Sequence, residues 1–425
     1  MSSGDVETWL YGPGLAALVE EARPEAACPE DLVLNLAIET ADDLRRAQTV
    51  TTASHLTITG LAGEAIELPC LRQIEAKLEI SSDLAELRLP ELYYAASIEV
   101  HSTSEVFDID LPKLRRAFGL SSEGPRFLAT RLQSAHVLQL AGPAGISSEF
   151  PHLARTGLVV ASQIRLSLPE LFGMEGTLST TGPVEVPSAL RLDTVSISEG
   201  GHLSAEQVVV AKQVSLRFTA NVQMNSLQAL EDFVAQFTGE SSLDGLNALE
   251  EVRTLLLQHT ELRSLPPSLR RIDTVSLLQN EALESIQLPV TELASFQVVG
   301  SPRLTLPELE TAGAFVVQGI GNETGDGLEL LLPRLREVAG DFSVTTTGVR
   351  TLSGVSGLQS AVSVGLVGNS LLEDTLLFPN LESIEDSIAI YNNPMLPTCA
   401  AMELVDRFGL SRFSVVGNLP DACSP

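Results

Sequence analysis

Short runs of alternating apolar and polar residues recur along the chain, and each run is followed by a polar turn. Clear copies are LTITG at Leu56, VSISEGG at Val195, VSLLQN at Val275, VGLVGN at Val364 and IAIYNN at Ile388. Alternation with a period of two residues is typical of a β-strand with one buried face. We therefore expect a short strand in each copy, with its first and third residues directed inward.

A second motif, Leu-Pro-x-Leu or Phe-Pro-x-Leu, recurs between these strands, for example LPEL at 89 and FPNL at 378. The predicted strand starts are Leu34, Leu56, Leu78, Ile98, Phe118, Val137, Leu158, Thr177, Val195, Val214, Phe233, Leu255, Val275, Phe296, Phe315, Phe342, Val364, Ile388 and Phe413. Their mean period of about 21 residues is too short for a helix pair but fits one strand, a turn and a return path. Coils of this size bury their apolar faces only by stacking. The pattern therefore predicts a mainly β fold, a single parallel β-solenoid of about 19 coils over residues 31–397.

Four asparagines occupy equivalent places just after their strands. They are Asn280, Asn369, Asn393 and Asn418. Asparagine tolerates the left-handed backbone conformation of tight turns, and its side chain can bind turn amides of an adjacent coil. We expect these residues to form an internal structural ladder and not a ligand site.

The two ends of such an array expose sheet edges that need covering. Residues 1–30 show helical spacing at Trp9, Leu15 and Leu18 and are predicted to form an N-terminal helical cap. Residues 398–425 are predicted to form a C-terminal cap, with a helix over 398–408 that has Thr398 as its N-cap, followed by the last strand.

The four cysteines lie near the predicted ends. Cys399 and Cys423 bracket the final coil, and a disulfide between them would contribute about 2–4 kcal/mol. Cys28 and Cys70 precede strands that are two rungs apart, or roughly 10 Å, which exceeds disulfide reach. We expect Cys28 and Cys70 to be free, or Cys28 to be displaced by the N-terminal cap. One terminal disulfide favours an oxidising compartment.

The charge balance narrows the classes of partner. Lys and Arg number 26 against 55 Asp and Glu, which gives a net charge of −29. A field of this sign argues against nucleic acid and anionic membranes. No apolar run reaches the roughly 18 residues of a transmembrane span. The first residues lack the features of a signal peptide, so the expected secreted or cell-envelope location requires that a leader was removed, and a cytoplasmic location is the alternative.

Few residues suggest chemistry. The six histidines are scattered, no nucleotide-binding or hydrolase motif is present, and we expect no cofactor, no metal site and no catalytic residues. Asp108 and Asp110 share one face of a predicted strand, a spacing that could serve acid–base or Ca²⁺-assisted cleavage of a polysaccharide. The loop GIGNETGDG is a candidate partner contact through Asn322, Glu323 and Asp326.

The outward middle residues of the strands change in character along the chain. Early ones are Thr57, Glu79 and Glu99, and we take the two glutamates as candidate partner contacts. Later ones are small, namely Ser196, Ser215, Ser276, Ser343, Gly365, Ala389 and Ser414. A flat face with an acidic beginning suits a broad partner, although small residues also simply allow close packing of coils.

The segments LPRLREVAGDFSVTTTGVRTL and FPNLESIEDSIAIYNNPMLPTC resemble receptor L-domain repeats. This resemblance implies right-handed coils, a ligand-binding role and, since the family occurs in bacterial surface proteins, a bacterial origin. The segment LEEVRTLLLQHTELRSLPPSL instead resembles a leucine-rich repeat, which leaves a leucine-rich-repeat arc as the alternative fold. The chain shows no cysteine-rich module or kinase, so receptor signalling is not implied.

These observations favour a non-enzymatic, monomeric binding or scaffold protein that recognises a protein or glycan through its extended sheet face. The alternatives are a polysaccharide-cleaving enzyme that uses Asp108 and Asp110, and a purely structural spacer.

Overall fold

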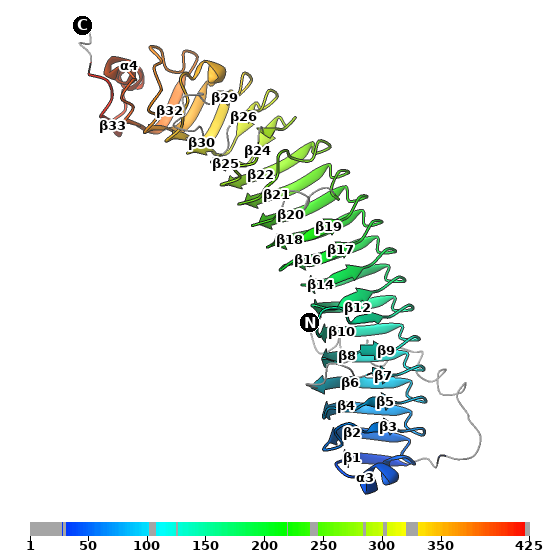
Figure 1. The fold of residues 1–425 in the computed structure, drawn as a ribbon. Coiled ribbons are helices and arrows are strands. Elements are labelled where there is room, and N and C mark those ends of the chain that lie inside the picture. The colour runs from blue at the N-terminus through cyan, green and yellow to red at the C-terminus, as the bar shows by residue number, and fades with distance from the viewer. Residues whose placement is uncertain are drawn as a thin grey trace. The chain divides into compact units, whose positions relative to one another are not determined.

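The described part of the chain is mainly β, with 50% of its residues in strands and 6% in helices, and forms a parallel β-solenoid of about 17 turns (Figure 1). The computed structural model describes residues 28, 31–101, 108–124, 126–218, 220–238, 245–283, 286–300, 304–319 and 330–420. The chain divides into two compact units, Met1–Ala189 (unit 1) and Leu190–Pro425 (unit 2). In the part of the chain that the structure describes, no helix is both long and apolar enough to cross a membrane.

In unit 1, every coil contributes one long strand to a parallel sheet. The long strands are β1 (Leu32–Ile38), β2 (Thr52–Thr59), β4 (Gln73–Ser81), β6 (Tyr94–His101), β8 (Arg116–Glu123), β10 (Ser134–Ala141), β12 (Arg155–Ser162) and β14 (Gly173–Thr180). Short return strands form a second parallel sheet: β3 (Ala65–Glu67), β5 (Glu86–Arg88), β7 (Asp108–Asp110), β9 (Arg126–Leu128), β11 (Ser147–Glu149), β13 (Arg165–Ser167) and β15 (Pro183–Glu185). The core lies between the two sheets.

Unit 2 repeats the long strands but has a less regular return path. Its long-strand sheet contains β16 (Arg191–Ile197), β18 (Val210–Arg217), β20 (Ala229–Gln236), β21 (Glu251–Gln258), β22 (Arg271–Leu278), β24 (Glu292–Leu293), β25 (Ser295–Val299), β27 (Thr311–Ala312), β28 (Phe315–Gln318), β30 (Glu337–Thr345), β31 (Ser360–Val367), β32 (Ser383–Tyr391) and β33 (Phe413–Val416). The return path carries β17 (His202–Ser204), β19 (Asn221–Gln223), β23 (Ile286–Gln287), β26 (Leu304–Thr305), β29 (Leu330–Leu331) and the 3₁₀ turn η2 (Ser353–Val355).

The predicted period is confirmed, because all of the predicted strand starts lie within strands of the long-strand sheets, although the structure has about 17 turns against the about 19 coils predicted. In unit 2 the predicted inward positions are also in register: Phe296 pairs with Phe315, which pairs with Phe342, and all three are fully buried. Their rings stack with centroids 5.0 and 5.5 Å apart, which forms an aromatic column inside an otherwise aliphatic core.

In unit 1 the inward positions were wrong by one or two residues at Leu34, Phe118, Val137, Leu158 and Thr177. Leu138 pairs with Leu120 and Val159, and these three residues are the buried ones. The reason in β12 is that neighbouring positions are all apolar: Leu158 and Val160 face outward, and Val159 between them is the buried residue. A shift of one residue exchanges the faces of a strand.

The helical caps are not confirmed. Apart from Cys28, residues 1–30 lie outside the described residues. The helix over 398–408 is present as α4 (Thr398–Phe408), but its N-cap is Pro397, and the Thr398 hydroxyl donates to the Leu419 carbonyl at 2.9 Å. A second helix, α3 (Ala41–Ala47), was not predicted; Thr40 and Asp43 form a capping box at its start. Each helix takes the place of a return strand, α3 between β1 and β2 and α4 between β32 and β33.

The prediction that Cys28 and Cys70 are free was wrong, because they form a disulfide with their Cα atoms 5.5 Å apart. The prediction assumed that Cys28 lies two rungs from Cys70. Cys28 precedes β1, which begins at Leu32, so its position is not fixed by the spacing between strands. Cys399 is also disulfide-bonded, while Cys423 lies outside the described residues.

Candidate functional site

The outward face of the long strands in unit 1 brings the two candidate glutamates together. Thr57, Glu79 and Glu99 pair in register on successive coils. Lys77 lies on the same face, and its Nζ is 3.1 Å from Glu79 Oε2 and 2.8 Å from Glu99 Oε2. The hydrogen bond to Glu99, followed by that to Glu79, raises the pKa of Lys77. The acidic beginning of the face therefore carries its own counter-charge, which could have been read from the position of Lys77, two residues before Glu79.

In unit 2 the same outward row is formed mainly by small residues. Ser196 pairs with Ser215, and farther along Ser343, Gly365, Ala389 and Ser414 pair in succession. A Cβ atom at Gly365 would lie 3.2 Å from the Ser343 hydroxyl, so the coils approach closely here. The row also contains Val234, Leu256 and Val316, which the sequence analysis did not assign to it. The result is a half-exposed surface mainly of short hydroxyl and apolar side chains, interrupted by the longer, exposed Gln297.

The four asparagines are buried behind this sheet. Asn369 Oδ1 accepts hydrogen bonds from the Thr347 amide and hydroxyl, at 3.0 and 2.7 Å, and Asn369 Nδ2 donates to the Val344 carbonyl at 2.8 Å. Asn393 Oδ1 accepts from the Asn369 amide, and Asn418 Oδ1 accepts from the Asn393 amide. Asn280 makes the equivalent bonds to Thr260 and Leu257. These side chains are therefore used by the backbone of neighbouring coils.

Asp108 and Asp110 lie at the two outward positions of the short strand β7, with the buried Ile109 between them. The Arg126 guanidinium donates to both Asp108 oxygens, at 3.1 and 2.7 Å. Burial raises the pKa of Asp110, and the positive charge of Arg88 opposes that rise. The pair therefore consists of one carboxylate bound by arginine and one carboxyl group that is harder to ionise.

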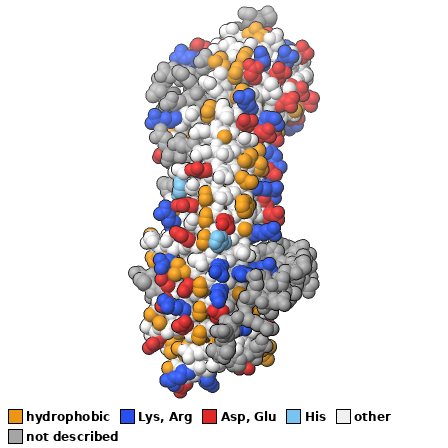
Figure 2. Space-filling model, turned by 90° about the vertical axis from the view of Figure 1, so that its right-hand side faces the viewer, with side chains coloured by type: hydrophobic (Ala, Val, Ile, Leu, Met, Phe, Trp, Pro, Cys, Tyr) orange, Lys and Arg blue, Asp and Glu red, His pale blue; other side chains and the backbone are white. Residues whose placement is uncertain are grey.

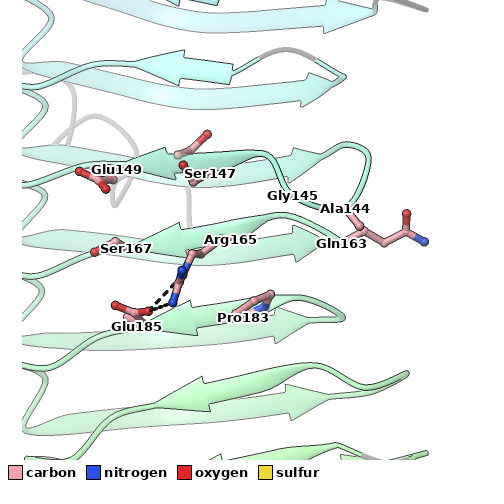
Figure 3. Close-up of a pocket in the computed structure, with 10 residues that line it drawn as sticks. Ala144, Gly145, Ser147, Glu149, Gln163, Arg165, Ser167, Pro183 and Glu185 are labelled. Atoms are coloured by element: carbon pink, nitrogen blue, oxygen red, sulfur yellow. Dashed lines mark hydrogen bonds and ion pairs between the residues drawn. The ribbon is translucent and has the colours of Figure 1, made fainter. Parts of the chain in front are cut away.

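A shallow depression of about 770 Å³ lies farther along the same face of unit 1, over β11, β13 and β15. Its lining is mixed: the polar residues Ser147, Glu149, Arg165, Ser167 and Glu185 lie on the short strands, and Ala144, Gly145 and Pro183 lie beside them (Figure 3). Arg165 donates to Glu185 through Nε at 3.2 Å and Nη2 at 3.0 Å. On the face drawn in Figure 2, basic and acidic side chains likewise lie next to one another and apolar ones form small groups.

An exposed aromatic stack in unit 2 was not found from the sequence. Phe218, Phe237 and His259 follow β18, β20 and β21, and their ring centroids are 5.5 and 4.8 Å apart with nearly parallel planes. All three residues have left-handed backbones, with φ of 50°, 54° and 49°. The phenylalanines are 52% and 47% exposed. The signal was the recurrence of an aromatic residue directly after a strand.

The remaining candidates are not placed. Asn322, Glu323 and Asp326 lie outside the described residues, as does Cys423. Among the described residues, no group of three or more His, Cys, Asp or Glu side chains is placed to hold a metal ion.

Comparison with known proteins gives little further information. No family model matches the chain, and no curated protein matches it. Among solved structures, the crystal structure of a TLR13–ssRNA13 complex is similar, with 14% sequence identity, 94% of this chain and 82% of that chain covered, and a TM-score of 0.22. A TM-score of this size carries no inference, so the function of this solenoid has to be argued from its own surfaces.

Proposed function

We propose that this chain is a non-enzymatic binding or scaffold solenoid that recognises a protein or glycan partner through the outward face of its long strands. The observation that supports this proposal is the row of short side chains on the unit 2 sheet, stacked in register from Ser343 to Ser414. Extended sheets of this kind are the usual docking surfaces of solenoids, because a broad partner contacts many coils at once.

We further propose that the protein works in the cell envelope or outside the cell. The Cys28–Cys70 disulfide and the disulfide-bonded state of Cys399 support this location, since disulfides persist in oxidising compartments. Alkylation of the native protein, taken directly from the cell, should modify cysteine only after reduction. Labelling without reduction would contradict an oxidising location.

Photo-crosslinking tests the binding surface. A benzophenone amino acid would be placed at Ser215 or Ser276, on the outward face of the long strands, and as a control at Ser204, on the outward face of the short return strands. Incubation with envelope extract should give the same discrete adduct from both long-strand positions and none from Ser204.

Equal adducts from all three positions would contradict a specific surface. No adducts with either proteins or glycans would favour a spacer role. Substitution of Ser215 and Ser276 by Arg should abolish the adduct formed at a third position of the row, Ser343, while the thermal unfolding midpoint of the protein stays unchanged.

A polysaccharide-cleaving activity is the second candidate, and the raised pKa of Asp110 is the observation that favours it, because a protonated carboxyl group can act as a general acid. Against it, Asp108 is held by Arg126. An assay for new reducing ends on polygalacturonate with Ca²⁺ would decide the matter. Activity that disappears in Asp108→Asn and Asp110→Asn variants would replace the binding proposal.

A further inference from the structure

Five successive coils of unit 1, those that lead into β4, β6, β8, β10 and β12, each enter the long strand through a step of two outward residues that lies between two buried residues. In successive coils these steps are residues 72–73, 93–94, 115–116, 133–134 and 154–155, here named the approach row. The row is in register: the Tyr93 amide donates to the Arg72 carbonyl at 3.0 Å, and the Arg115 amide donates to the Tyr93 carbonyl at 3.0 Å. Tyr94 pairs with Arg116 in the next coil, and two coils farther on Arg155 occupies the same column.

The approach row is basic in a strongly acidic protein. It contains four arginines (Arg72, Arg115, Arg116 and Arg155) and no carboxylate, although Asp and Glu outnumber Lys and Arg by 55 to 26 in the whole chain. None of these four arginines forms an ion pair with any residue that the structure describes. Arg72 Nε is buried without a hydrogen-bond partner. By contrast, Arg88, Arg126 and Arg165 on the short-strand face of the same unit are each bound by a carboxylate.

The fold does not require this arrangement, because the equivalent row in unit 2 carries carboxylates, one of which pairs with an arginine of the next coil. There the Arg270 amide donates to the Glu250 carbonyl, and Arg271 follows Glu251 in register. Arg271 Nη1 lies 2.8 Å from Glu251 Oε1. Stacking of coils is thus compatible with carboxylates at these positions, and their absence from the unit 1 row leaves guanidinium groups open to an external anion.

Aromatic rings accompany these arginines. Tyr93 and Tyr94 form the step between Arg72 and Arg115, and the Tyr93 hydroxyl donates to Gln73 Oε1 at 3.2 Å, which holds its ring in the row. Phe118 and His136 are the next outward residues after the approach row in β8 and β10, and their rings stack with centroids 4.9 Å apart. Guanidinium groups bind carboxylates through two parallel hydrogen bonds, and aromatic rings pack against the apolar C–H surface of a sugar.

We propose that the approach row of unit 1 binds a linear, carboxylated polysaccharide laid along the coils. This inference rests on the proposed binding function. It names the class of ligand that would bind where the long strands of unit 1 begin. Rungs about 4.8 Å apart present the arginines as a straight track and not as a pocket, which suits an extended polymer. The net charge of −29 repels any polyanion. The repulsion is stronger for nucleic acid, which carries a charge on every nucleotide, than for a glycan with a carboxylate on every second sugar.

The test uses the full chain and hyaluronate oligosaccharides, in which glucuronate alternates with an uncharged sugar. Titration calorimetry at low salt should show binding that weakens as salt is added. Arg116→Ala and Arg155→Ala should each weaken binding about tenfold, the effect of losing one charge-assisted hydrogen bond. Arg116→Lys should be intermediate, since it keeps the charge and loses the fork. Arg271→Ala, the matched control in unit 2, should bind like the parent protein.

Three outcomes would overturn the proposal: no binding of hyaluronate or polygalacturonate, equal weakening by Arg271→Ala, or preferential binding of single-stranded oligonucleotide that Arg116→Ala abolishes. Circular dichroism and thermal unfolding of each variant show whether it is folded, and the exposed Arg155 gives a second position should Arg116→Ala unfold. Failure here leaves crosslinking at Ser215 and Ser276 unaffected, so it is distinguishable from failure of the proposed function.

Discussion

At the scale of single residues, neighbours in register explain more than neighbours in sequence. Asn369 is polar and fully buried, and its three side-chain hydrogen bonds all go to a coil more than 20 residues earlier in the chain. The role of this asparagine was predictable, because its position after the strand repeats. The pairing of Lys77 with Glu99 was missed, because Glu99 belongs to the next coil and opposes the lysine only once the register is known.

Replacement of Asn369 by Ala tests the ladder. The variant leaves the Thr347 amide, the Thr347 hydroxyl and the Val344 carbonyl without their partner in a buried place, and each such loss costs about 1–3 kcal/mol. We expect the free energy of unfolding of unit 2 to fall by about 3 kcal/mol or more in urea titration. The exposed Asn35 of unit 1 provides a control for the substitution itself, since Asn35→Ala should change the free energy of unfolding of its own unit by less than about 0.5 kcal/mol. A similar small effect at Asn369 would refute the ladder.

Asp193 gives a pH-dependent prediction. The hydrogen bond from Lys212, whose Nζ lies 2.7 Å from Asp193 Oδ2, lowers the pKa of Asp193, and Arg191 adds to this effect. A carboxylate with a depressed pKa stabilises the fold above its unfolded pKa of about 3.9, and that contribution is lost as pH falls through the folded value. Asp193→Asn should therefore cost about 1 kcal/mol or less at pH 7 and nothing at strongly acid pH. A cost that is independent of pH in urea titrations would contradict the ion pair.

At the scale of elements, the repeat period could be predicted from the sequence. Which residues of each strand point into the core could be predicted only in part. In FSVTTT and IAIYNN the apolar residues alternate cleanly, and the predicted inward residues Phe342 and Ile388 are buried, whereas Phe413 in the last strand is exposed, contrary to the prediction. In LVVAS the residues Leu158, Val159 and Val160 are all apolar, so alternation cannot show which face is inside. The structure buries Val159, one position after the predicted inward residue Leu158. The approach row was equally hidden, although Arg115 and Arg116 directly follow an LPKL motif.

The disulfide between Cys28 and Cys70 ties the chain before β1 to the turn that precedes β4. It closes a loop with a sequence separation of 42, for which chain entropy gives a stabilisation of about 4 kcal/mol. A Cys28→Ser, Cys70→Ser variant should therefore unfold its first coils at lower temperature, seen as a reduced midpoint of the earliest transition in calorimetry. The parent protein with this bond intact serves as reference, and an unchanged midpoint would show that the bond adds nothing to the stability of unit 1.

At the scale of the whole molecule, the contacts are overwhelmingly between successive coils, as in other repeat proteins, so stability should be close to a sum over neighbours. Phe342 in β30 tests this, because its ring stacks on Phe315 at 5.5 Å and meets Phe378 edge to face at 5.4 Å. Phe342→Ala removes a fully buried ring and should cost about 3–5 kcal/mol.

If stability is additive over neighbouring coils, that cost appears locally. Hydrogen exchange of the intact Phe342→Ala variant should show lost protection in β28, β30 and β31, with unchanged protection in β4 to β12 of unit 1. The control is Phe127→Ala, which removes an equally buried ring from β9 and should reverse the pattern. Uniform loss of protection in both variants would mean that the solenoid unfolds as one cooperative body. A polymer bound to the approach row would then stabilise every coil equally, whereas local stability confines that effect to unit 1.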